Sequence, residues 1–374
     1  MRIIVTFFLC MSLALFGIAQ NQNVAPRQIT RLPLEILESS GIAISGSNLI
    51  WSHEDSGNDN VLYGFDTLGQ LKRTLTVANV PNTDWEDLAV DEDGNIFIAD
   101  LGNNNNQRND LAIYKIPDPG NITGNTVTAE ILTVSFADQT AFPPAASERN
   151  FDVEAIAWRD GSLYLFTKNR GFPFTGVTKM YKMDDQPGSY SLLPEDTFVV
   201  GTNSEIDRIT SADYNRIKDE LVLLTHNRLI SFKDFPDDRF FEGTITEYTF
   251  STLPGQNEAI GYITPDKLYM TEEGSGGQGG WLYEVKLPAS MGVITTGSNH
   301  SLSICPVPAT GVISVTADMP DNTPVLISDS DGRAVLKSSL GSCRNLDVSE
   351  YRQGIYFVTL SGKSYRVTRR FVKQ

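Results

Sequence analysis

Long helical runs of Ala, Glu, Lys and Leu are missing from the 374-residue chain, whereas Tyr, Phe, Gly and Asn are plentiful. This composition favours strands and turns over helices. Beyond the N-terminus, no apolar run approaches the roughly 18 residues of a membrane-spanning helix, so we expect the mature protein to be soluble. The sequence also lacks a Gly-x-Ser-x-Gly motif, which excludes the nucleophile turn common among hydrolases.

Positive charge is scarce in most of the chain. The net charge is −16, but residues 301–374 carry +3 and the remainder carries −19. An acidic body repels phosphates, so the composition argues against nucleic acid as a partner. Cysteine is also rare, and Cys305 and Cys343 in the last 75 residues either form a disulfide bridge or remain two free thiols.

The N-terminus reads MRIIVTFFLCMSLALFGIAQ, in which one Arg precedes an apolar run that ends near the small residues Gly17 and Ala19. This pattern is typical of a secretory signal peptide, and we expect residues 1–19 to be removed. Cys10 follows Leu9 rather than a small residue, which argues against a lipoprotein anchor.

Five similar units of strand-like segments follow. Their first strands read SGIAIS, EDLAVD, EAIAWR, TSADYN and EAIGYI, and the second and third strands are almost wholly apolar, as in strands buried on both faces. Repeated units of four antiparallel strands predict the blades of a β-propeller. We therefore expect an all-β fold with a five-bladed propeller over residues 20–288, or six blades if the long interval after the second first strand hides another. Crowding around a central axis requires one small residue in each first strand, and the sequence has Ala43, Ala89, Ala157, Ala212 and Gly261 there.

The fifth unit lacks a fourth strand of its own after Pro288. The N-terminal segment QITRLPLEI could supply it, which would close the ring and remove a free sheet edge. The acidic stretch VDEDGNI in the second unit lacks the ligand spacing and the distal Glu of an EF-hand. We interpret it as a hairpin turn with solvated carboxylates.

The motif GNIFIAD, in this repeated setting, resembles the repeats of NHL and gluconolactonase-like (SMP-30-like) propellers. The resemblance implies the fold more than the activity. Gluconolactonase-like propellers use Glu, Asn and Asp ligands around a divalent metal in the funnel, and Ca²⁺ prefers several such oxygens. Acidic residues also recur where the first strands of this chain enter the funnel, and we interpret them either as metal ligands or as structural ties between blades: Glu86, Glu154, Asp207 and Glu258.

The second strands end on the face where the first strands begin, because the two run antiparallel. Propellers commonly bind ligands in this mouth, where loops from many blades meet. Lys168, Arg170 and Arg228 could bind an anionic group there. The predicted ligand-contacting residues are His53, Asp55, Asp100, Asn103, Lys168, Asn169, Arg170, His226, Asn227, Arg228, Glu272 and Glu273.

Two kinds of function remain open from these residues. One is a hydrolase of a lactone, phosphoester or glycan, in which a metal polarises a substrate oxygen or a bound water. The other is a non-catalytic module that binds a glycan, a peptide or another surface protein. We expect a small anionic or sugar ligand in the funnel, Ca²⁺ as the candidate cofactor, and a monomeric chain.

A linker at residues 289–302 leads to a second module at residues 303–374. The module contains PVPATG, VLISDSDGRAV, LDVSEYRQGIYFV and a basic end, RRFVKQ. In this order the motifs resemble the type A C-terminal sorting domain of the type IX (Por) secretion system of Bacteroidetes, although Cys305 and Val307 stand where Tyr and Asn are usual. The resemblance implies export through Sec, recognition by the type IX machinery, and a product at the cell surface or outside the cell. Two hairpin patterns predict that the module is a small β-sandwich.

Overall fold

The computed structural model describes residues 20–45, 49–252, 254–288, 302–317, 319–329, 334–361 and 366–374. The chain divides into two compact units, Met1–Pro288 and Ala289–Gln374. The predicted signal peptide at residues 1–19 and nearly all of the predicted linker lie outside the described residues.

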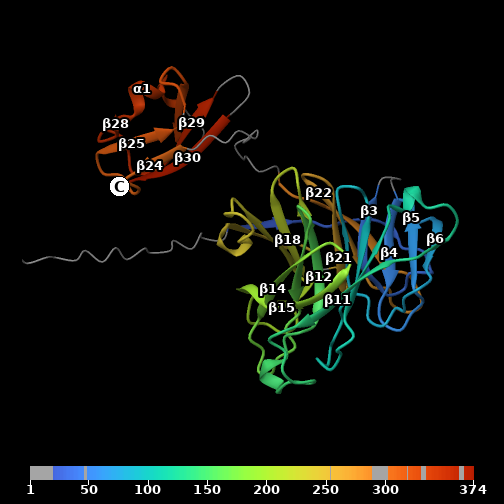
Figure 1. Cartoon of the computed structure of the whole chain (residues 1–374). Helices are drawn as coiled ribbons and strands as arrows, with labels where there is room; N and C mark the ends of the chain where they lie inside the picture. The colour runs from blue at the N-terminus through green and yellow to red at the C-terminus, as the bar shows by residue number, and fades with distance from the viewer. Residues whose placement is uncertain are drawn as a thin grey trace, which may run out of the picture. The chain divides into compact units, whose positions relative to one another are not determined.

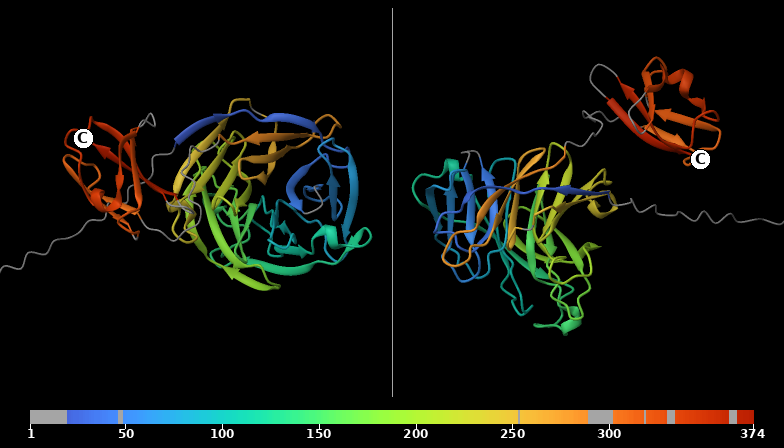
Figure 2. Two further views of the ribbon diagram at one scale, coloured as in Figure 1. Left: turned by 90° about the horizontal axis from the view of Figure 1, so that it is seen from above. Right: turned by 180° about the vertical axis from the view of Figure 1, so that it is seen from behind.

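The described part of the first unit contains five sheets arranged around an axis (Figure 2, left), which confirms the five-bladed propeller. The strands of each blade follow one another from the axis outward, and neighbours are antiparallel. Blade one has β3 (Ser39–Ser45), β4 (Leu49–Glu54), β5 (Val61–Phe65) and β6 (Leu71–Val77); blade two has β7 (Leu88–Val90), β8 (Ile96–Asp100), β9 (Ala112–Ile116) and β11 (Glu130–Phe136). Blade three has β12 (Val153–Arg159), β13 (Ser162–Thr167), β14 (Val177–Asp184) and β16 (Pro194–Val199). Blade four has β17 (Ile209–Asn215), β18 (Glu220–Thr225), β19 (Arg228–Lys233) and β20 (Thr244–Phe250); blade five has β21 (Asn257–Thr264), β22 (Lys267–Glu272) and β23 (Trp281–Lys286).

The innermost strands form a closed ring, in which β3 contacts β7, β7 contacts β12, β12 contacts β17, β17 contacts β21, and β21 contacts β3. The predicted small position lies at the crowded centre of this ring. Ala43, Ala89, Ala157 and Ala212 are each no more than 4% exposed. A larger side chain here would push neighbouring blades apart, because protein interiors have little free volume.

The N-terminal segment closes the ring as predicted: β2 (Arg27–Arg31) pairs antiparallel with β23 and completes blade five. Three further strands, which were not predicted from the sequence, join outermost strands in parallel. These are β1 (Gln20–Val24) on β20, β10 (Thr126–Val127) on β6, and β15 (Gly188–Leu192) on β11. Because β10 joins blade one, the long interval after β7 holds no sixth blade in the described residues, and that alternative is wrong.

Two long connections of the first unit position the candidate site. One joins β8 to β9, and the other joins β11 to β12 and contains the short helical turn η2 (Ala146–Glu148). Figure 1 shows this second connection, coloured green, extending below the blades. Two other helical turns, η1 (Pro119–Asn121) and η3 (Phe240–Glu242), lie outside these connections.

The second unit is the predicted sandwich of two sheets. One sheet has the order β24–β25–β28 and the other β27–β26–β29–β30, and both contribute to one apolar core that includes Val315, Ile327 and Phe371. Cys305 is exposed and Cys343 is buried, and both are free, which agrees with the two-thiol alternative. The elements of this second unit are β24 (Leu302–Cys305), β25 (Val312–Ala317), β26 (Pro324–Asp329), β27 (Ala334–Ser339), α1 (Leu340–Cys343), β28 (Asn345–Asp347), β29 (Gly354–Ser361) and β30 (Arg366–Lys373).

Candidate functional site

Carboxylates from three consecutive blades converge where the innermost strands begin. Asp55 follows β4, Asp84 and Glu86 precede β7, and Asp152 and Glu154 lie at the start of β12. Asp55, Asp84 and Glu86 have carboxylate oxygens within 4.8 Å of one another, and so do Glu86, Asp152 and Glu154. We call the first set the unpaired group and the second the paired group, after their different contacts with cations. Glu86 belongs to both.

Two of the three carboxylates in the paired group, Asp152 and Glu154, form ion pairs with two cations from blade three. Lys168 Nζ lies 2.8 Å from Glu154 Oε2, and Arg170 reaches both Asp152 Oδ2 at 2.5 Å and Glu154 Oε1 at 2.6 Å. Burial alone would raise the pKa of Glu154, but Lys168 and Arg170 outweigh it and hold this pKa below its ordinary value. Burial and the charge of Glu154 raise the pKa of Asp152 to about 6, although Arg170 opposes them.

The unpaired group has no directly paired cation, although the charges of Arg108 and Lys168 oppose the rise in pKa of Asp84 and Asp55, respectively. Within the described residues, no Lys, Arg or His forms an ion pair with Asp55, Asp84 or Glu86, and the carboxylate of Glu86, which is 4% exposed, accepts no hydrogen bond. Burial, followed by the charges of Asp152 and Asp55, raises the pKa of Asp84 to about 7. Burial and the neighbouring carboxylates raise the pKa of Glu86 well above its ordinary value. Crowded carboxylates without a paired cation offer the oxygen ligands that a hard divalent cation prefers.

The backbone around the unpaired group is fixed before any ligand binds. The N–H of Glu86 donates to Ala99 O at 2.9 Å, and Ser40 Oγ donates to Glu86 O at 2.8 Å. Gly102 makes room for the side chains, since a Cβ at this position would lie 2.2 Å from Glu86 Oε1 and 2.4 Å from Asp84 Cγ. A side chain at residue 102 would therefore displace the carboxylates of Glu86 and Asp84 from this arrangement.

Three other predicted residues act on this cluster electrostatically. Burial raises the pKa of Glu258 to about 7, with Lys168 opposing the shift. Burial raises the pKa of Glu273 to about 7, and the charge of Asp55 adds to the shift. Burial and the charge of Lys168 lower the pKa of His226 to about 4, so this imidazole is neutral near pH 7.

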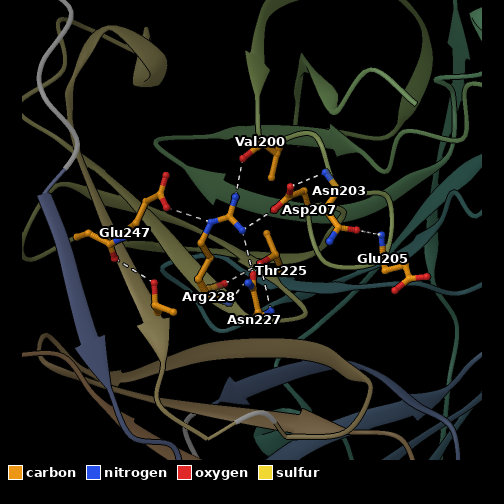
Figure 3. Close-up of polar contacts among 10 residues, drawn as sticks. Val200, Asn203, Glu205, Asp207, Thr225, Asn227, Arg228 and Glu247 are labelled. Carbon is orange, nitrogen blue, oxygen red and sulfur yellow. Dashed lines mark hydrogen bonds and ion pairs between the residues drawn. The ribbon is translucent and has the colours of Figure 1, made fainter. Parts of the chain in front are cut away.

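Asp207, a predicted metal ligand, belongs to a different network, centred on Arg228 (Figure 3). Arg228 Nη1 donates to Asp207 Oδ1 at 2.6 Å and to Asn227 Oδ1 at 2.9 Å, Nη2 donates to Val200 O at 2.5 Å, and Nε lies 3.2 Å from Glu247 Oε2. The structure therefore groups Glu86 and Glu154 with Asp152, and it uses Asp207 to neutralise Arg228.

Several predicted ligand residues are already engaged in the fold. His53 is fully buried, contacts Trp85 edge-on, and has a pKa lowered to about 4 by burial. Asp100 accepts from Tyr114 Oη at 2.8 Å and pairs with an arginine, and Glu272 accepts from a tyrosine hydroxyl at 2.8 Å. The backbone N–H of Asn103 donates to Asp152 at 2.5 Å and so ties the β8–β9 connection to the paired group. Asp100 and Glu272 are therefore committed to the fold, whereas His53 Nε2 and Asn103 Nδ2 are buried without a hydrogen-bond partner in the described residues, and Asn103 lines the pocket beside Asp84.

The carboxylate that ties blades together is Asp87, which sequence reasoning missed. Its oxygens accept hydrogen bonds from the N–H groups of Ile156 and Ala212, at 3.0 and 3.2 Å, and from Ser211 Oγ at 3.0 Å. Ser211 Oγ in turn accepts from the N–H of Ile260 at 3.1 Å, so one chain of contacts links blades two to five. Asp87 thus plays the structural role that was one alternative for Glu86, Glu154, Asp207 and Glu258, without excluding that role for them.

Asp84 and Asp152 were also missed as members of the cluster, although a signal was present. Blade two reads Asp-Trp-Glu at 84–86 and blade three reads Asp-Val-Glu at 152–154. The same Asp-x-Glu spacing at the entrance to two adjacent inner strands puts both carboxylates of each pair at one end of the ring. Comparison of these two entrances alone would have added both aspartates.

An open pocket of about 360 Å³ lies beside the unpaired group. Its walls include Asp84 itself, the hydroxyl and amide side chains of Ser56, Thr83, Asn104 and Gln107, and Arg108, which pairs with Asp100 and Asp110. A pocket of this composition offers hydrogen-bond donors and acceptors to a hydroxyl-rich ligand that also reaches the unpaired group.

Residues 303–374 match the family model of the secretion system C-terminal sorting domain. The C-terminal unit is a type IX sorting domain. The chain is therefore secreted cargo that interacts with the type IX machinery through this domain and is delivered to the cell surface or the extracellular space. In the part of the chain that the structure describes, no helix has the length and hydropathy needed to cross a membrane.

The propeller is similar to solved structures of gluconolactonases and sugar dehydrogenases. A gluconolactonase from Xanthomonas campestris shares 12% identity over 71% of this chain and 87% of its own, with a TM-score of 0.40. The PQQ-bound aldose sugar dehydrogenase from Streptomyces coelicolor shares 11% identity over 72% of this chain and 99% of its own, with a TM-score of 0.43. No curated protein matches the chain. Similarities this distant transfer neither an activity nor a ligand.

Proposed function

We propose that this secreted protein binds a divalent cation, Ca²⁺, in the mouth of its propeller and, together with it, a small sugar-like ligand. The observation that carries the proposal is the unpaired group, whose three carboxylates approach within 4.8 Å with no cation paired to them. Export would begin through Sec with removal of residues 1–19, before the type IX step.

The difference in charge between the two groups supports the assignment to Asp55, Asp84 and Glu86. Lys168 and Arg170 already occupy the oxygens of Glu154, so a cation there would have to displace two buried ion pairs. A cation on the unpaired group displaces none and removes the mutual repulsion of its carboxylates. Ca²⁺ takes six to eight oxygen ligands, which leaves positions for hydroxyl groups of a ligand in the adjoining pocket.

An anionic ligand is less well supported. The three cations predicted to attract one, Lys168, Arg170 and Arg228, each pair with a carboxylate inside the fold, and Arg108 in the pocket wall pairs with Asp100. Arg208, whose charge interacts with Asp152 and Glu154, makes no ion pair in the described residues and is the one cation among these five that an anion could approach. A sugar requires no unpaired cation, and the hydroxyl and amide lining of the pocket suits it. Ca²⁺-dependent turnover of a chromogenic lactone, phosphoester or glycoside would extend the function from binding to hydrolysis.

A thermal melt tests the proposal on the mature chain, residues 20–374, in EDTA and then in excess Ca²⁺. Binding to the folded state raises the melting temperature by mass action. At a free Ca²⁺ concentration of 100 times Kd, the free energy of unfolding increases by about 2.7 kcal/mol. We expect Glu86→Gln to abolish the rise. The matched control Glu258→Gln changes a carboxylate that is equally buried but outside both groups, and it should keep the rise. A Ca²⁺ shift that survives Glu86→Gln would refute this site.

A further inference from the structure

A second pocket, of about 430 Å³, lies between the β11–β12 connection and the start of β14. Its lining is rich in hydroxyl and amide groups, among them Thr140, Ser147, Asn150, Asn169 and Thr175. Asn169, predicted from the sequence to contact a ligand, thus faces this pocket and makes no contact with the carboxylate cluster. The pocket shares no lining residue with the one beside Asp84.

Two exposed aromatic side chains stand on the loops that border this pocket. Phe142 is 50% exposed and Phe172 is 79% exposed. Their loops are joined by hydrogen bonds, from the N–H of Phe172 to Ala146 O at 2.9 Å and from the N–H of Arg170 to Arg149 O at 3.0 Å. Single exposed apolar residues are common, but two phenylalanines on joined loops beside one pocket form a local apolar feature that needs an explanation.

Charge restricts what the pocket can hold. Its only lysine among the described lining residues, Lys179, lies 2.6 Å from Asp138 and 3.8 Å from the centre of the Phe151 ring. Glu148 in the lining is exposed and makes no ion pair within the described residues. An anion would therefore meet an unpaired carboxylate and no free cation.

An extended peptide is also disfavoured. The pocket lies at the N-terminal end of β14, and the carbonyl of Val177 is taken there by the side-chain amides of Asn150 at 2.9 Å and Asn169 at 3.1 Å. A peptide that added to this strand end would have to displace both amides. A neutral pyranose chain needs neither a free cation nor a strand end, because its C–H faces pack on aromatic rings and its hydroxyl groups can bond to the hydroxyl side chains of Thr140 and Ser147.

We propose that this pocket, flanked by Phe142 and Phe172, is a second ligand site that holds a neutral glycan chain. It does not depend on the cation proposed for Asp55, Asp84 and Glu86. A secreted protein with this site would attach to polysaccharide outside the cell and leave the propeller mouth free for its own ligand.

Affinity electrophoresis of the mature chain through gels that contain dextran, xylan or mannan tests this site. We expect at least one polysaccharide to retard the protein, with the same retardation in EDTA. The double variant Phe142→Ala/Phe172→Ala should lose roughly tenfold or more in affinity, as expected when exposed aromatic anchors are removed. The matched controls Leu34→Ala and Ile217→Ala remove side chains that are 69% and 81% exposed elsewhere and should migrate like the parent chain.

Three outcomes would overturn the proposal: no retardation by any of the three polymers, retardation that survives the double variant, or retardation that disappears in EDTA. The last would assign glycan binding to the mouth. A melting temperature of the double variant within a degree or so of the parent would show that the fold is intact, as expected for exposed residues. Because the Ca²⁺ melt depends on Glu86 and not on either phenylalanine, failure of one proposal leaves the other standing.

Discussion

The paired and unpaired groups share Glu86, but the fold shifts the pKa of Glu154 in the first and of Asp84 in the second in opposite directions. In the paired group, Lys168 and Arg170 offset burial and hold the pKa of Glu154 below its ordinary value. In the unpaired group, burial acts on Asp84 without a paired cation and raises its pKa to about 7. Carboxylates only a few ångströms apart therefore form an ion-pair network on one side and a candidate ligand set for a cation on the other.

This difference shows why a count of acidic residues is a poor guide to a metal site. Repetition of carboxylates in the sequence marks where side chains converge, but not which of them retain free oxygens. Asp87 is a second example. It is fully buried, and its carboxylate oxygens already accept hydrogen bonds from backbone and hydroxyl donors. The useful measure is how many donors or cations each carboxylate already has.

The largest expected effect comes from breaking the paired group with Lys168→Met. Glu154 would lose one buried partner, and the free energy of unfolding should fall by about 3 kcal/mol in urea titrations at pH 7. Because the pKa of Glu154 is lowered in the folded state, the stability it contributes is present above its unfolded pKa and is lost as pH falls through the folded value. The penalty of Lys168→Met should therefore shrink in acid. A loss that is the same at pH 4 and pH 7 would contradict this account.

The unpaired group should give the opposite dependence on pH. The pKa of Asp84 rises from 3.8 to about 7 on folding, so between these values the folded state binds more protons than the unfolded chain. In EDTA, its contribution therefore lowers stability as pH rises from about 4 to about 7, and saturating Ca²⁺ should remove this loss. Asp152, Glu258 and Glu273 titrate in the same range, so the comparison is with Asp84→Asn, which should show a shallower slope. Equal slopes for the two proteins would contradict the assignment.

The fold could be predicted from the sequence more fully than the site could, for physical reasons. Buried strands must be apolar and inner strands must be small at the axis, so Ala43 and its counterparts predicted the blades directly. Short parallel additions such as β10 have only two residues and no periodicity to detect. The site depends on which blades adjoin and where long side chains end. The sequence therefore placed Lys168 at the mouth correctly as a strand end but could not show that it is bound to Glu154.

The smallest expected effect separates the Arg228 network from the unpaired group. Asp207→Asn weakens one ion pair of Arg228, which still has Glu247, Asn227 and Val200 O as partners. The free energy of unfolding should fall by about 1 kcal/mol, and the rise in melting temperature with Ca²⁺ should be unchanged, because Asp207 is in neither group. If the Ca²⁺ shift disappeared in this variant, Asp207 would have to approach Glu86 in the cation-bound protein. The blades would then rearrange around the cation. The difference between the unpaired and the paired group would in that case describe only the cation-free protein.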